Sequence, residues 1–219
     1  MLASSAVLAF ELGTDSDSVA VSGDLTLDGR LDITDAGGFG PGVYTLFTYN
    51  GVLTDNGLDV GTKPDMNLVY MISTNTPGQV KLNVLTQFAA WQIQYFGSTN
   101  NPDAAPGADP LGKGMSNTNQ YLAGLNPTNP SSVFEVSEAA RDNSSHFEVK
   151  WFSVGGKGYR LQFGDGDTNG SYNGVFTDIP VDFTDPNPEG TQGTLGFVDD
   201  FTITGAVTNR SRYYRVRLN

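Results

Sequence analysis

The sequence of 219 residues contains no cysteine and a single histidine, His146. Without thiols there are no disulfides, so stability has to come from burial of apolar side chains, which is feasible at this length. Most zinc hydrolase sites use two or three His or Cys ligands, and this chain cannot supply them. A Ser-His-Asp triad would have to include His146. No catalytic motif is recognisable, and no catalytic residue is predicted.

Charged residues are also scarce, at 16% of the chain, and acidic ones predominate, which gives a formal net charge of −12. Such a surface repels nucleic acid and anionic lipid, so we expect neither as a partner. No apolar run approaches the roughly twenty residues of a membrane span, so no membrane insertion is expected. The start, MLASSAVLAFELG, lacks an early basic residue and contains Glu11. It is therefore predicted to be a strand rather than a signal peptide, as expected for part of a longer exported precursor.

Glycine is abundant, with 27 residues, and Thr, Asn and Asp are frequent. Gly, Asn and Asp supply the positive φ that tight turns need, so this composition predicts many short strands. We predict a mainly all-β fold in three parts. These are a β-rich domain at 1–85, a short helical connector at 86–130 and an antiparallel β-sandwich at 131–219.

In residues 1–85, apolar side chains alternate with polar ones, which is the period of a half-buried strand. The alternation holds over Leu25–Ile33, where Gly29 is expected to mark a turn or bulge. It also holds over Val43–Tyr49. Further strands are predicted at 68–72 and 80–84. No helix is predicted in this part.

The patterns SVAVSGDLTLDGRLDI, GPGVYTLFTYNGVL and VKLNV resemble the last coils of autotransporter-associated β-strand repeat proteins. Those are large bacterial exported chains that are thought to wind as a parallel β-helix. The resemblance implies a β-helix-like fold for residues 1–85 and an extracellular or cell-surface location. From the alternation alone, an independent β-sandwich is the other interpretation of this part.

Residues 88–96 place aromatic and aliphatic side chains at helical spacing, and Gly97 is expected to end that helix. A second short helix is predicted over 116–123, with a serine as its N-cap. The following segment, 126–130, contains two Asn-Pro pairs. We expect it to be an extended, stiff linker, because a residue before proline disfavours helical backbone.

Residues 109–120 of this connector resemble the calcium loop of EF-hand, dockerin and thrombospondin type 3 proteins. In that loop, oxygen ligands occupy positions 1, 3, 5, 7, 9 and 12, and a glycine at position 6 makes the sharp turn. Asp109 matches position 1, Gly114 matches position 6 and Asn117 matches position 9. Asp109 and Asn117 are therefore the candidate metal ligands here.

Three other positions of the same loop depart from the calcium pattern. Leu111 stands at position 3, Lys113 at position 5 and Gln120 at position 12, where carboxylates are expected. A lysine puts positive charge where the metal would lie, and the closing bidentate carboxylate is missing. We expect the loop to keep its fold and to bind no calcium tightly.

A second candidate metal site combines Asp165, Asp167 and Asn169, which precede Gly170. Oxygen ligands at alternate positions followed by glycine are typical of calcium loops, but Phe176 stands where the last carboxylate would be. A weak cation site is one interpretation. A hairpin turn is the other, because Asp-Gly and Asn-Gly favour hairpins. The expected cofactor is therefore none, or at most Ca²⁺.

Residues 131–219 are predicted to form antiparallel strands with one apolar face each. Trp151 and Tyr214 lie on that face and are expected in the core. The pattern KWFSVGGKGYRLQF … SRYYRVRL resembles immunoglobulin-like or fibronectin-like modules at the C-terminus of exported proteins. The strands are predicted at 147–151, 159–163 and 214–218.

Arginines gather near the end of the chain, at positions 210, 212, 215 and 217. Arg215 and Arg217 share the outward face of the last predicted strand. They either receive an anionic partner or pair across strands with Asp or Glu. We favour such pairs, each of which contributes under about 1 kcal/mol.

These observations favour a non-catalytic structural or adhesive segment of a secreted or cell-surface bacterial protein. The expected partner is a cell-surface or polysaccharide ligand. The alternative is a carbohydrate-binding protein, or a hydrolase that depends on carboxylates and a divalent cation. Asp199-Asp200, or Asp165 with Asp167, would supply paired carboxylates for glycoside hydrolysis, although acidic turns explain both pairs more simply.

Overall fold

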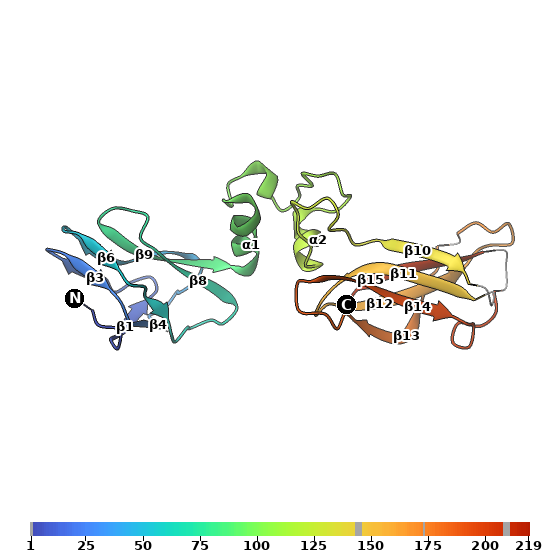
Figure 1. Ribbon diagram of the computed structural model, residues 1–219, viewed down its shortest axis with the longest axis horizontal. Helices are drawn as coiled ribbons and strands as arrows, with labels where there is room; N and C mark the ends of the chain where they lie inside the picture. Colours follow the sequence, from blue (N-terminus) through green and yellow to red (C-terminus); the bar gives the residue numbers. More distant parts are fainter. Residues whose placement is uncertain (1, 143–145, 173, 208–210) are drawn as a thin grey trace. The chain divides into compact units, whose positions relative to one another are not determined.

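The computed structural model describes residues 2–142, 146–172, 174–207 and 211–219 (Figure 1). It contains 44% strand and 9% helix, which confirms the predicted all-β class. The chain forms two compact units, residues 1–99 and 100–219.

The strands of the first unit form three parallel ladders. Val19 lies opposite Phe47 in one ladder and Leu25 lies opposite Leu53 in another, so both pairs have the same separation along the chain. In these two ladders, a strand therefore pairs with the strand that follows it by the same number of residues along the chain. The ladders are β1 (Val7–Leu12) with β4 (Arg30–Asp35) and β7 (Asp59–Val60), β2 (Val19–Val21) with β5 (Gly42–Tyr49), and β3 (Leu25–Leu27) with β6 (Leu53–Asp55).

An antiparallel hairpin extends one of these ladders. β8 (Leu68–Ser73) pairs with β9 (Gln79–Thr86), and β9 also pairs with β5, which gives the strand order β2-β5-β9-β8. The predicted strands at 68–72 and 80–84 correspond to these two strands. The first unit thus changes from parallel to antiparallel pairing toward its C-terminal end.

The core of the first unit is built from the apolar phase of the alternating strands. Leu27, Leu31 and Leu82 are fully buried, whereas their strand neighbours are more exposed. Gly29 separates β3 from β4 with a φ of 91°, and a Cβ atom there would lie 2.5 Å from the Ala6 carbonyl oxygen. Only glycine fits this crowded left-handed turn, so the predicted interruption at Gly29 is confirmed.

Both predicted helices are present. α1 (Gln87–Phe96) begins at the Thr86 cap and ends at Gly97, whose φ is 76°. α2 (Asn117–Leu122) begins at Ser116, whose hydroxyl accepts a hydrogen bond from the Asn119 amide. A short 3₁₀ helix, η1 (Pro102–Ala104), lies between them. Among the described residues, no helix has the length and apolar character needed to cross a membrane.

The second unit ends in two antiparallel sheets that share one core. Trp151 from one sheet is fully buried together with Tyr159 and Leu161 from the other. Tyr214 packs against the same cluster and is half-buried. One sheet has the order β10 (Val136–Arg141), β11 (Phe147–Val154), β14 (Gln192–Asp199), and the other β13 (Thr177–Thr184), β12 (Gly158–Asp165), β15 (Arg212–Leu218).

Candidate functional site

Asp109 organises the calcium-like loop through backbone hydrogen bonds. Its Oδ1 accepts from the Lys113 amide at 2.9 Å, and its Oδ2 accepts from the Gly114 amide at 2.7 Å. Gly114 has a φ of 77°, which is the left-handed backbone that the glycine of such a loop provides. Asp109 therefore closes a tight turn over residues 109–114.

Asn117 and Gln120 are buried polar side chains of the same loop. The Asn117 Nδ2 donates to the carbonyl oxygens of Asp103 and Ala105, at 2.7 and 2.9 Å. The Gln120 Nε2 donates to the Met115 carbonyl at 2.8 Å. Their other amide atoms, Asn117 Oδ1 and Gln120 Oε1, are buried and accept no hydrogen bond within the described residues. Both side chains thus hold the segment before α2 in place through hydrogen bonds to its carbonyl oxygens.

Lys113 reaches from the loop to the segment that follows α2. Its Nζ donates to the carbonyl oxygens of Asn126, Asn129 and Ser132, at 2.9, 3.2 and 3.0 Å. The expectation of an extended linker at 126–130 is wrong, because the Asn126 Oδ1 accepts from the Thr128 amide at 2.9 Å. An asparagine side chain that bonds to the backbone two residues on closes a turn.

These contacts decide how well the loop suits a calcium ion. Burial lowers the pKa of Lys113, and the nearby Asp109 carboxylate partly opposes that effect. The single carboxylate of the loop therefore already has a cation beside it. The side chains at positions 3, 5 and 12, which bring most of the charge in a calcium loop, are Leu111, Lys113 and Gln120. The loop therefore offers a cation one carboxylate, Asp109, among its ligand positions.

The second candidate begins at Asp165, the last residue of β12, and continues with Asp167 and Asn169 in the turn that follows. The Asp167 Oδ1 accepts from the Asn169 amide at 2.9 Å and from the Ser171 amide at 2.8 Å, so this carboxylate closes its own turn. Asp165 instead pairs with Arg212, at 2.9 Å. Over the described ranges, no three His, Asp or Glu side chains gather in a cluster that would hold a metal ion.

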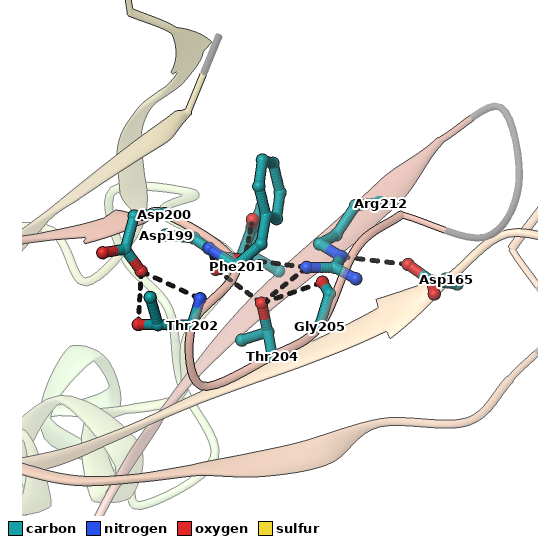
Figure 2. A network of polar contacts seen from close by, with 9 residues as sticks. Asp165, Asp199, Asp200, Phe201, Thr202, Thr204, Gly205 and Arg212 are labelled. Carbon is teal, nitrogen blue, oxygen red and sulfur yellow. Dashed lines mark hydrogen bonds and ion pairs between the residues drawn. The ribbon is translucent and has the colours of Figure 1, made fainter. Parts of the chain in front are cut away.

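Arg212 joins two carboxylates inside the sandwich (Figure 2). Its Nε donates to Asp165 Oδ1 at 2.9 Å, and its Nη1 donates to Asp199 Oδ2 at 3.0 Å and to Thr204 Oγ1 at 2.6 Å. The arginine side chain is fully buried, and that of Asp199 is 1% exposed. Asp165 and Arg212 are direct cross-strand neighbours in β12 and β15, so the strand register creates this pair.

The Asp199 carboxylate is held in its ionised form. Burial alone would raise its pKa, but hydrogen bonds from Thr204, Tyr214, the Phe201 amide and Arg212 together keep the pKa below the usual range. The Tyr214 hydroxyl lies 2.7 Å from Asp199 Oδ2, and burial next to this carboxylate raises the pKa of Tyr214. The neighbouring Asp200 accepts from Thr202 and takes no part in the network (Figure 2). The sequence pair Asp199-Asp200 is thus divided between two separate sets of contacts.

Arg215 and Arg217 lie on the outward face of β15. The favoured pairing with Asp or Glu across strands is wrong for both. Arg217 lies opposite Arg160, and Arg215 lies opposite Gln162, to which its Nε donates at 2.8 Å. Within the described residues no ion pair of Arg217 is found, whereas Arg160 pairs with Asp182 at 2.6 Å. Arg210 lies outside the described residues.

Three aromatic rings continue this outward face beyond Arg215. The Arg215 guanidinium lies 4.4 Å from the ring centre of Phe176. The ring of Tyr172 lies 4.9 Å from that of Phe176 and 5.5 Å from that of Tyr213. Tyr172 is 46% exposed, so one aromatic surface of the group is open to a ligand. The sequence did not indicate this group, because Tyr172 and Phe176 belong to a turn without strand alternation.

Part of the chain resembles a known bacterial adhesin. Over 72 residues, 32% of this chain, the sequence is 50% identical to the adhesin BmaC autotransporter of Brucella suis biovar 1 (strain 1330). The chain covers 2% of that adhesin's length. No protein-family model matches the sequence, and no solved structure matches it. A third of the chain is thus similar to a segment of an autotransporter adhesin.

Proposed function

We propose that this chain is a non-catalytic, adhesive segment of a bacterial protein at the cell surface or outside the cell. The observation that carries the proposal is the 50% identity over 72 residues to an autotransporter adhesin. Identity at this level over such a length implies a shared local fold, while the rest of the chain contributes its own surface.

We further propose that the first unit consists of the last coils of a parallel β-helix. Three parallel ladders with similar spacing support this interpretation, because a chain that winds in coils places each strand beside its equivalent one coil later. The antiparallel pair β8–β9 then covers the last ladder and ends the winding. A β-sandwich is instead built mainly from antiparallel pairs.

The connector at 86–130 is proposed to be a metal-free joint. The three carbonyl oxygens around Lys113 Nζ support this role, since they would otherwise require a bound cation or water. In this proposal the loop keeps the backbone of a calcium loop and replaces the ion by its own ammonium group. Asp165, Asp167 and Asn169 are proposed to form a structural turn.

Bead attachment tests the adhesive role. Beads coated with the whole chain are expected to attach to cultured epithelial cells in larger numbers than beads coated with albumin at equal density. A chain unfolded by heating serves as the matched control and should behave like albumin. Equal attachment of all three bead types contradicts the proposal. Turnover of a polysaccharide that is lost in Asp200→Asn would favour the hydrolase alternative instead.

Limited proteolysis tests the proposed division of the chain. Residues 98–110 contain three prolines and mostly exposed side chains, so the first cuts are expected there. They should release a stable C-terminal piece that contains the sandwich. First cuts inside 147–163, which include β11 and most of β12, would contradict these boundaries.

A further inference from the structure

We propose that the outward surface of the sheet β13-β12-β15 binds an anionic polysaccharide. This surface is called the arginine–aromatic face, and it comprises Arg160, Arg215, Arg217, Tyr172, Phe176 and Tyr213. The inference rests on the adhesive function proposed above and names the partner and the residues of that contact.

The arrangement of charge on this face favours a negatively charged partner. Arg217 and Arg160 are direct cross-strand neighbours, although like charges opposite each other destabilise a sheet. Asp182 compensates Arg160, which leaves Arg217 exposed without an ion pair in the described part of the chain. Two arginines opposite each other are unusual in a chain of net charge −12. Such an unfavourable pair is expected at a binding site, where the ligand supplies the missing negative charge.

Distant acidic residues do not cancel this attraction. At physiological ionic strength, charges further away than about 8 Å are largely screened, so the groups on the face itself decide its local potential. Of the two aspartates of β13 on this face, Asp182 pairs with Arg160, and Asp178 accepts a hydrogen bond from the Gln162 side-chain amide and keeps its charge. The three arginines of the face therefore outnumber its two strand carboxylates. Arg215 and Arg217 on β15 therefore remain available for charge-assisted hydrogen bonds to carboxylate or sulfate groups.

The aromatic rings favour a sugar over other anions. Tyr172 is 46% exposed and packs against Phe176 and Tyr213, so its ring forms a firm apolar surface. The Tyr213 hydroxyl donates to the Gly170 carbonyl at 2.8 Å, which fixes the turn that carries Tyr172. A pyranose ring has an apolar C–H surface that suits such an aromatic ring, and its acidic substituent would reach Arg215.

Protection of a sheet edge is the other explanation of these arginines. β15 ends the strand order of its sheet, and charged side chains on edge strands prevent association between sheets. That role requires charge alone. It does not account for an exposed tyrosine beside the arginines, so the two explanations differ in what removal of Tyr172 should do.

Biolayer interferometry with the whole chain immobilised provides the test. Soluble alginate offers carboxylates, dextran sulfate offers sulfates and dextran is the neutral reference, all in buffer at 0.15 M salt (on the order of physiological ionic strength) without divalent cations. Binding to at least one anionic polymer and none to dextran is expected. The two anionic arms show which acidic group is preferred. Arg217→Ser should weaken binding about tenfold, which corresponds to one charge-assisted contact. Tyr172→Ala should weaken it by a similar factor, because the ring surface under the sugar is lost.

Arg141→Ser is the matched control, because Arg141 is exposed on the other sheet of the same sandwich. It should change affinity less than about twofold, as expected for a charge outside the contact. Equal loss in Arg141→Ser, or no binding to either anionic polymer, overturns the proposal. Equal binding of polyglutamate would assign the face to acidic polypeptides and also overturn it. Self-association of Arg217→Ser in gel filtration, with unchanged polymer binding in Tyr172→Ala, would establish edge protection instead.

The bead assay separates this inference from the adhesive function. Beads that attach equally well with wild-type chain and with Arg217→Ser would support adhesion and refute this contact. Polymer binding that depends on Arg217 and Tyr172, together with no bead attachment, would support this contact and refute adhesion to those cells.

Discussion

Lys113 in the connector and Arg212 in the sandwich are both cations held by the fold, but their partners differ. Lys113 is surrounded by three neutral carbonyl oxygens, with one carboxylate nearby. Arg212 is fully buried between the carboxylates of Asp165 and Asp199. A half-buried cation can be satisfied by backbone dipoles, whereas a fully buried one requires opposite charge. The two sites should therefore respond differently to mutation, acid and calcium.

Removal of the buried guanidinium should have the largest effect. Arg212→Met leaves Asp165 and the buried Asp199 without their counter-charge, so unfolding free energy should fall by about 3–5 kcal/mol. Urea unfolding followed by tryptophan fluorescence measures this change, since Trp151 lies in the same core. Arg215→Ala, on the outward face, should cost under about 1 kcal/mol. A larger effect of Arg215→Ala would mean that the two arginines have been assigned to the wrong faces.

Removal of the connector ammonium should have an intermediate effect. Lys113→Met eliminates three hydrogen bonds to carbonyl groups but leaves no unpaired charge in the core, so about 1–3 kcal/mol is expected. Hydrogen exchange should increase in the turn at 126–132, whose carbonyls lose their donor. Lys63→Met in the first unit is the matched control and should leave that turn unchanged. Faster exchange in the sandwich strands instead would mean that Lys113 supports the sandwich rather than the joint.

Acid should weaken the Arg212 site, because Asp199 becomes protonated, and should leave the Lys113 site unaffected. An unfolded aspartate titrates near about 3.9, and the folded pKa of Asp199 lies below that value. The folded state then binds fewer protons than the unfolded state. The stabilisation is complete above about pH 4 and is lost as pH falls through the folded pKa.

The measurement compares wild type, Asp199→Asn and Lys113→Met by urea unfolding at several pH values. The stability difference between wild type and Asp199→Asn should be greatest at neutral pH and should shrink below about pH 4. Lys113→Met should follow the wild-type acid profile at a lower level. A constant difference for Asp199→Asn across the whole range would show that its pKa is not depressed.

Calcium should have the smallest effect, namely none on the wild type. Calorimetry at neutral pH is expected to show no micromolar site, because Lys113 and Gln120 stand at ligand positions. The triple variant Leu111→Asp, Lys113→Asp, Gln120→Glu restores three carboxylates and should gain calcium-dependent stability. A wild-type calcium signal that Asp109→Ala abolishes would contradict the metal-free joint.

Local patterns were sufficient to predict both helices and the strands with clear alternation, because alternation, caps and glycines act within a few residues. Strands β10, β13 and β14 were not predicted. Gly29, Ser116 and Gly97 stand where those patterns required them. The Arg212 network depends on the register of β12 with β15 and on the turn after Asp199, neither of which alternation determines. Its only sequence signal was an arginine on the apolar phase of the last strand.

The turn at Asn126 was missed for a different reason. Proline disfavours helical backbone in the residue before it, which suggested extended chain, but asparagine can close a turn with its own side chain. Tertiary contact with Lys113 then selects the turn. Two Asn-Pro pairs three residues apart were the signal for turns, since asparagine is a preferred first residue of a turn.

Because Lys113 belongs to the chain, the stability of this loop should not depend on the calcium concentration of the medium. A bound ion stabilises a fold by mass action, so its contribution falls as the medium is depleted of that ion. An ammonium group that is covalently part of the chain has an effective concentration independent of dilution or chelators. The loop and turn held by Lys113 are therefore expected to keep their local conformation in fluids of any calcium content, a property useful to a protein exposed to a changing environment.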